Sequence, residues 1–192
     1  MPYSFEQIIG FLAGVFEFGA FLLYYVSILQ GKTRQNRATW FVITVVGVLI
    51  VMSYYASGAR ETLWVPISYA VGPLIAFLLA LRYGEGGWTP FDQGCLLACA
   101  VSIIFWKISE NPEMTLFFNL LIDFFGLLPT IKKAYLDPLS EDKAAWLVTS
   151  FSNFLNILAI TSWTFVIGFY PVYMLVVNGL VTTLLFVRKG TK

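Results

Sequence analysis

Two acidic residues, Glu17 and Asp123, stand within apolar stretches that are long enough to cross a membrane. An ionised carboxylate at the centre of a bilayer is costly unless it faces a polar interior, pairs with a partner or holds a proton. Two carboxylates that share one cavity cannot both ionise cheaply, so such a pair suits a proton relay or a site for a cationic solute. Two separate acids, each hydrogen-bonded within the fold, are the alternative.

Four asparagines in the same kind of apolar stretch predict further substrate-binding groups. Asn119 precedes Asp123 by about one helical turn, and Asn153 and Asn156 lie three residues apart on one helical face. Asn178 stands in the last apolar stretch. The competing use of these amides is hydrogen bonding between helices.

The two acids occupy equivalent positions of an internal repeat. Residues 16–47 match residues 122–153 without a gap, at the offset of 106 residues that separates Glu17 from Asp123. Trp40 falls on Trp146 at this offset, which continues as far as Arg82 and Arg188. One register over so much chain indicates that an ancestral unit was duplicated.

The composition excludes an ordinary soluble domain. Hydrophobic residues make up 58% and charged residues 12% of the 192 residues, and the mean hydropathy is +0.77. A hydrocarbon core of about 30 Å requires about 20 helical residues. The apolar segments predict seven membrane spans, over residues 5–29, 38–56, 63–81, 91–106, 115–131, 144–162 and 169–187. The end of the sixth span is placed by analogy with the second, because the apolar segment 163–168 is able to extend it.

The repeat predicts how these spans are arranged. The 106 residues between equivalent positions cross the membrane four times, so equivalent helices cross it in the same direction. We expect an all-α integral membrane protein of two parallel three-helix bundles, formed by residues 1–83 and 111–192 and related by a pseudo-two-fold axis along the membrane normal. A linker helix within residues 84–110 would invert the chain between them. Ser140 is predicted as the N-cap of the helix that leads to Trp146.

The basic residues predict the orientation. Ten of the twelve lysines and arginines fall on the side of the C-terminus, and Arg60 and Lys107 fall on the other side. By the positive-inside rule the N-terminus lies outside and the C-terminus lies in the cytoplasm, with the plasma (inner) membrane as the expected location. The first span lacks a basic segment before it, so a retained helix is predicted rather than a signal peptide.

Four residues are assigned to gating. Trp40 and Trp146 begin the second and sixth spans at equivalent depths, where interfacial anchoring is the alternative to an intracellular gate. Pro73 follows Gly72 near the middle of the third span, and Pro129 lies in the fifth. Because proline removes a backbone donor, the third span is expected to break or bend there, as a hinge, a substrate contact or a packing feature.

Three plus one plus three spans with the N-terminus outside resemble the SWEET and PQ-loop transporters and, more loosely, the PnuC-type vitamin transporters. The segment Leu128-Pro129-Thr130 approximates the Pro-Gln motif near the cytoplasmic end of the first helix of a repeat, whereas its counterpart at residues 22–24 does not. Asn178 matches the asparagine that SWEET proteins carry in the last helix of each bundle. The resemblance implies a facilitative or proton-coupled transporter with a central site between the bundles.

The predicted substrate is a small polar or cationic solute, since no basic residue inside the spans would meet an anion. Protons, membrane lipids and a second copy of the chain are the other expected partners, and nucleic acid is not. The sequence lacks nucleotide-binding, hydrolase and metal-ligand motifs, so neither enzymatic activity nor a cofactor or metal is predicted. Cys95 and Cys99 are interpreted as buried apolar side chains rather than a metal or redox pair. A non-transporting membrane sensor, receptor or assembly factor is the alternative function.

Overall fold

The computed structural model describes residues 3–35, 37–84, 89–90, 93–94, 97, 100–101, 104, 107–108 and 111–188, except for the side chains of Ala38, Pro112 and Pro129. No strand occurs among these residues, which confirms the predicted all-α class. The main helices are α1 (Phe5–Leu29), α2 (Arg37–Ala56), α3 (Trp64–Tyr83), α5 (Pro112–Leu136), α6 (Lys143–Leu158) and α7 (Phe165–Val187). Short 3-10 turns, η1 (Glu61–Leu63) and η2 (Pro138–Ser140), precede α3 and α6.

Five helices in the described part of the chain are long and apolar enough to cross a membrane. They correspond to α1, α2, α3 with η1, α5 and α7. Helix α6 has 16 residues and is therefore about 24 Å long. These helices are compatible with the integral membrane protein that the composition predicts.

The boundary between α6 and α7 differs from the prediction. Helix α6 ends at Leu158 instead of Ser162, and the apolar segment that follows belongs to the start of α7. Thr164 begins α7 because its hydroxyl oxygen accepts a hydrogen bond from the Ile167 N–H at 3.2 Å, as an N-cap residue does.

The predicted N-cap of α6 is wrong by two positions. Pro138 starts the turn η2, and Ser140 ends it with its hydroxyl donating to the carbonyl of Asp137 at 2.7 Å. Asp142 is the N-cap, because its backbone is extended and its Oδ1 accepts from the Ala145 N–H at 2.9 Å.

Most of the fourth predicted span, including Cys95 and Cys99, lies outside the described residues. Those of its residues that are described are helical. Leu97 is 67% exposed and Ile104 is 56% exposed. Exposed apolar side chains of this kind are what a helix presents to lipid.

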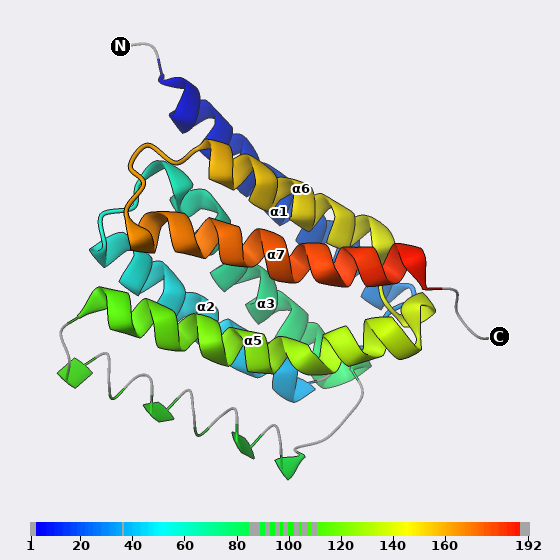
Figure 1. Cartoon of the computed structure of the whole chain (residues 1–192). Helices are drawn as coiled ribbons and strands as arrows, with labels where there is room; N and C mark the ends of the chain where they lie inside the picture. Colours follow the sequence, from blue (N-terminus) through cyan, green and yellow to red (C-terminus); the bar gives the residue numbers. More distant parts are fainter. Residues whose placement is uncertain are drawn as a thin grey trace.

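The helix contacts follow the internal repeat. Helix α3 packs against α1 and α2, and α7 packs against α5 and α6. Helix α1 also packs along α6, and α2 packs along α5. Because α1, α2 and α3 are equivalent to α5, α6 and α7, each of these contacts has a counterpart at the repeat offset. Figure 1 shows α7 lying between α5 and α6.

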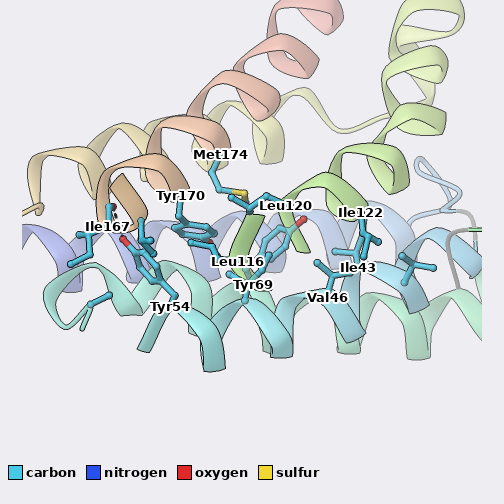
Figure 2. Packing of buried hydrophobic residues seen from close by; sticks show 14 of the residues in the cluster. Ile43, Val46, Tyr54, Tyr69, Leu116, Leu120, Ile122, Ile167, Tyr170 and Met174 are labelled. Atoms are coloured by element: carbon cyan, nitrogen blue, oxygen red, sulfur yellow. Dashed lines mark hydrogen bonds between the residues drawn. The ribbon is translucent and has the colours of Figure 1, made fainter. Parts of the chain in front are cut away.

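The largest buried cluster joins helices from both repeats (Figure 2). Tyr54 and Tyr170 are 0% exposed, and their ring centroids are 4.8 Å apart. Side chains of α2, α3, α5 and α7 extend the cluster, among them Ile43, Val46, Tyr69, Leu116, Leu120, Ile122 and Met174. The two repeats therefore share one core.

Tyr54 also replaces a missing backbone hydrogen bond. Pro171 lies inside α7 and has no N–H to donate to the carbonyl of Ile167, four residues earlier. The Tyr54 hydroxyl donates to that carbonyl at 2.9 Å and lies 3.0 Å from the Thr62 hydroxyl oxygen. This contact ties α2 to α7 at the point where α7 lacks its own donor.

We predict that Tyr54→Phe lowers the stability of the protein by about 1–3 kcal/mol, because the buried Ile167 carbonyl loses its partner. Thermal unfolding of the purified protein in detergent measures the loss. Pro171→Ala restores a backbone N–H for the same carbonyl, so Tyr54→Phe should cost less in that background. Equal losses in the two backgrounds would show that the hydroxyl does not substitute for the helical bond.

Candidate functional site

A cavity lies between the six main helices. Its volume is about 50 Å³. This volume holds a few waters. Its aromatic lining is Phe21, Tyr24, Trp40, Tyr69 and Trp146, and its polar lining is Glu17, Thr130, Thr149 and Asn178. Both repeats contribute to the wall, as expected for a central site.

Glu17 lies in the wall of this cavity. Its side chain is 0% exposed, and neither carboxylate oxygen makes a hydrogen bond of good geometry among the described residues, although the hydroxyls of Ser152 and Thr149 lie beside it. The nearby Ser152 hydroxyl donates to the carbonyl of Ala13 at 2.8 Å. A buried carboxylate without a partner is costly. This position therefore calls for a proton or a positively charged ligand.

Asp123, the repeat counterpart of Glu17, has a different environment. Its Oδ1 accepts from the Tyr69 hydroxyl at 2.6 Å, and its Oδ2 accepts from the Tyr173 hydroxyl at 2.8 Å. Asp123 is 1% exposed and is not among the described residues that line the cavity, although Tyr69 is. The two carboxylates thus do not face one open cavity, and Tyr69 stands between Asp123 and the space beside Glu17.

The four predicted asparagines are buried, and Asn178 lines the cavity. The amides of Asn153 and Asn178 each donate to a carbonyl one turn earlier in their own helix, at 2.8 Å. Several amide atoms have no hydrogen-bond partner in the described part of the chain. They are Nδ2 and Oδ1 of Asn119 and of Asn156, and Oδ1 of Asn153. Asn119, Asn153 and Asn156 are not among the described lining residues, so only Asn178 reaches the cavity beside Glu17.

The structure brings both predicted gating tryptophans to the cavity. The ring centroid of Trp40 lies 5.1 Å from that of Tyr24, and Trp146 lies in the wall contributed by α6. Helix α3 continues through Pro73 as one element, so the span is not broken there, and the bend stays a prediction. The carbonyl that lacks a helical donor because of Pro73 is that of Tyr69, four residues earlier. The Tyr25 hydroxyl donates to a different carbonyl, that of Gly72, at 2.8 Å and so ties α1 to α3. The Pro129 side chain lies outside the described set.

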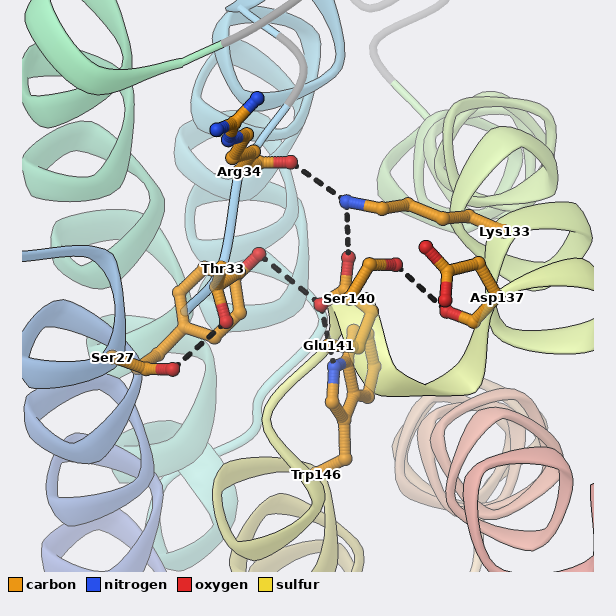
Figure 3. Close-up of polar contacts among 9 residues, drawn as sticks. Ser27, Thr33, Arg34, Lys133, Asp137, Ser140, Glu141 and Trp146 are labelled. Carbon is orange, nitrogen blue, oxygen red and sulfur yellow. Dashed lines mark hydrogen bonds and ion pairs between the residues drawn. The ribbon is translucent and has the colours of Figure 1, made fainter. Parts of the chain in front are cut away.

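A network around Glu141 lies next to the part of the cavity wall that Tyr24 and Trp146 form (Figure 3). Oε2 of Glu141 accepts from the Tyr24 hydroxyl at 3.3 Å and from Nε1 of Trp146 at 3.2 Å. Oε1 lies 3.4 Å from Nζ of Lys133, which donates to the carbonyl of Arg34 at 2.7 Å. This Glu141 network joins α1, α5, α6 and the loop before α2, at the end where Tyr24 and Trp146 line the cavity.

Burial and nearby charge have opposite effects on the pKa of the Glu141 carboxyl. Burial raises its pKa above the ordinary value, while the positive charge of Lys133 and the hydrogen bonds from Trp146 and Tyr24 oppose the rise. With a raised pKa in the folded protein, the contribution of Glu141 to stability is larger below its ordinary pKa and is lost as the pH rises through the shifted value. The ionised group stays in place through Lys133 and the two donated hydrogen bonds.

Glu141 was not among the predicted site residues. The repeat offset carries a usable signal, because Glu141 is the counterpart of Gln35 in the first repeat. Gln35 is 2% exposed, and its side-chain amide donates to the carbonyl of Ala76 at 3.3 Å. Polar residues at equivalent loop positions are therefore buried in both repeats.

No protein-family model, curated protein or solved structure matches this chain. The resemblance to SWEET, PQ-loop and PnuC-type transporters therefore stays a hypothesis that rests on the repeat and on the sequence motifs.

We predict that Glu141→Ala opens this end of the cavity, because Tyr24, Trp146 and Lys133 lose their shared acceptor. A Thr149→Cys reporter in a background with Cys95 and Cys99 replaced by serine measures access. Its rate of maleimide modification in detergent should rise about tenfold, since charge-assisted hydrogen bonds contribute about 1.5 kcal/mol or more.

Asp137→Ala is the control, because this acid is exposed in the same connection between α5 and α6. It should leave the modification rate unchanged. If Glu141→Ala also leaves the rate unchanged, the network does not restrict access to the cavity.

Proposed function

We propose that this protein is an integral membrane transporter for a small polar solute, with its binding site in the central cavity. The observation that carries the proposal is Glu17, a fully buried carboxyl without a hydrogen-bond partner in the described chain, in a wall that both repeats build. Packing alone gives no reason to retain such a group, whereas a proton or a solute does. An ionisable residue within a membrane span marks a pathway in this way.

The proposed architecture is two parallel three-helix bundles, residues 1–83 and 111–192, with a linker helix within 84–110 that brings the spans to seven. The contacts of α3 with α1 and α2, repeated by α7 with α5 and α6, support it. So do the reciprocal contacts of α1 with α6 and of α2 with α5. Pairs of this kind are expected from a pseudo-two-fold axis along the membrane normal.

In this proposal the N-terminus lies outside and the Glu141 network is the cytoplasmic gate. Trp40 and Trp146 form the wall next to that gate, and Tyr54 with Ile167 closes the opposite end. Transport proceeds when one closure breaks while the other holds, so that the cavity opens to one side at a time. The α1–α6 and α2–α5 contacts are the surfaces on which the bundles move.

The two acids have different roles in this mechanism. Glu17 meets the solute or a coupled proton directly, because its oxygens are unpartnered at the cavity wall among the residues described. Asp123 positions Tyr69 by accepting its hydroxyl hydrogen. Tyr69 in turn lines the cavity, so Asp123 acts on the site through this side chain.

A membrane sensor or receptor on the same fold is the second candidate. The small open volume favours it, since about 50 Å³ holds a few waters rather than a sugar or vitamin. Transport of a large solute would require the cavity to expand, whereas a sensor needs only to bind.

We predict that Glu17→Gln reduces uptake of a transported solute into proteoliposomes at least about tenfold, the factor that corresponds to one charge-assisted hydrogen bond. Asp123→Asn should reduce uptake less, because its amide oxygen still accepts from one tyrosine. Glu113→Gln, at an exposed acid of α5, is the control and should transport normally.

The measurement compares the variants by their uptake of labelled sugars, amino acids, amines and vitamins, with and without a pH gradient. Uptake that stays pH-dependent in both Glu17→Gln and Asp123→Asn contradicts proton coupling through these acids. If a solute binds and never crosses the bilayer, the protein is a sensor rather than a transporter.

A further inference from the structure

We propose that the central cavity binds a small organic ammonium cation, held by the Glu17 carboxylate and by aromatic rings of the cavity wall. The inference rests on the proposed function for the location of the site, and it adds the chemical class of the solute.

The charge of the cavity wall favours a cation. Glu17 is the one acidic side chain among the described lining residues, and no lysine or arginine is among them. Its two oxygens are fully buried and have no partner in the described chain. A positive charge in the cavity would supply the pairing that this carboxylate lacks, and an anion would face it without compensation.

Five aromatic side chains line this space, and several of them contact one another. The ring centroids of Tyr24 and Trp40 are 5.1 Å apart and tilted by 36°, and Phe21 meets Trp40 at 6.4 Å and 77°. Phe21 also meets Tyr69 at 6.5 Å and 54°. An aromatic ring attracts an alkylammonium group over its electron-rich face through cation–π attraction, so a cavity wall with this many rings favours such a cation.

An alkylammonium ion fits this lining better than a metal ion or a sugar. A metal ion needs several oxygen or nitrogen ligands, and the described residues contain no group of three acidic, histidine or cysteine side chains. A sugar needs many hydrogen-bonding partners, whereas most of the described wall is aromatic or aliphatic. The small volume limits the solute to a few heavy atoms while the Glu141 network is closed.

Binding to the purified full-length protein in detergent tests this inference. The probes are tetramethylammonium, choline and 3,3-dimethyl-1-butanol, the uncharged analogue that matches choline in shape. Thermal unfolding is followed over a concentration series of each probe, with sodium chloride added to equal ionic strength. Tetramethylammonium, choline or both should raise the unfolding temperature in a saturable manner, and the alcohol should not, because a ligand of the folded form shifts unfolding by mass action.

Two pairs of variants locate the site. Glu17→Gln should weaken the apparent affinity for the cation at least about tenfold, whereas Glu113→Gln should leave it unchanged. Trp40→Leu should weaken it and Trp40→Phe should retain part of it, because only the aromatic replacement keeps a ring face. The Trp40 pair keeps the test decisive if Glu17→Gln does not fold.

The inference is overturned if neither cation stabilises the protein or if the alcohol stabilises it as well as choline does. It is also overturned if cation binding survives both Glu17→Gln and Trp40→Leu. Cation binding without passage across the bilayer would leave this inference standing and remove the transport proposal. Passage of a neutral solute without stabilisation by either cation would overturn this inference and leave the transport proposal standing.

Discussion

The structure depends on one constraint, that polar groups in an apolar interior need partners. Tyrosine hydroxyls meet most of this need: Tyr25 and Tyr54 donate to backbone carbonyls of other helices, and Tyr69 and Tyr173 donate to Asp123. Each of these bonds joins two helices, so the same contacts that satisfy the polar groups also hold the helices together. Several buried polar atoms of the described residues lack such a bond, and among them the Glu17 carboxyl is the acidic group in the cavity wall.

The two repeats share their packing but differ in their polar residues. Helix α6 carries Ser152, Asn153 and Asn156 where helix α2 carries Val46, Gly47 and Ile50. Gly47 lies directly against the backbone of α3, so a Cβ there would come within 2.7 Å of the Tyr69 carbonyl oxygen. The first repeat is accordingly packed more tightly, and the second contributes most of the buried amides. Duplication thus preserved the helix contacts while the site became asymmetric.

The Glu141 network beside the cavity is built from connections between helices rather than from the core itself. Glu141 and Lys133 hold the loop before α6 against α1 and against the loop before α2. Breaking these few polar contacts would free this side of the cavity without exposing the buried cluster around Tyr54 and Tyr170. A network of this kind can open at low cost while the shared core stays intact.

The all-helical class, the bounds of α1 at Phe5–Leu29 and the repeat whose offset relates the helix contacts were all predictable from the amino-acid sequence. They follow from local apolar patterns and from the gap-free match between the two halves. The burial of Glu17 was predictable as well, since a carboxyl in an apolar span needs a polar interior, a partner or a proton. The enclosure of Asp123 by tyrosines from α3 and α7 was not predictable, nor was the contact of Glu141 with Tyr24, Trp146 and Lys133. Those partners come from helices far apart in the chain, and no local pattern records which side chains meet when the helices pack.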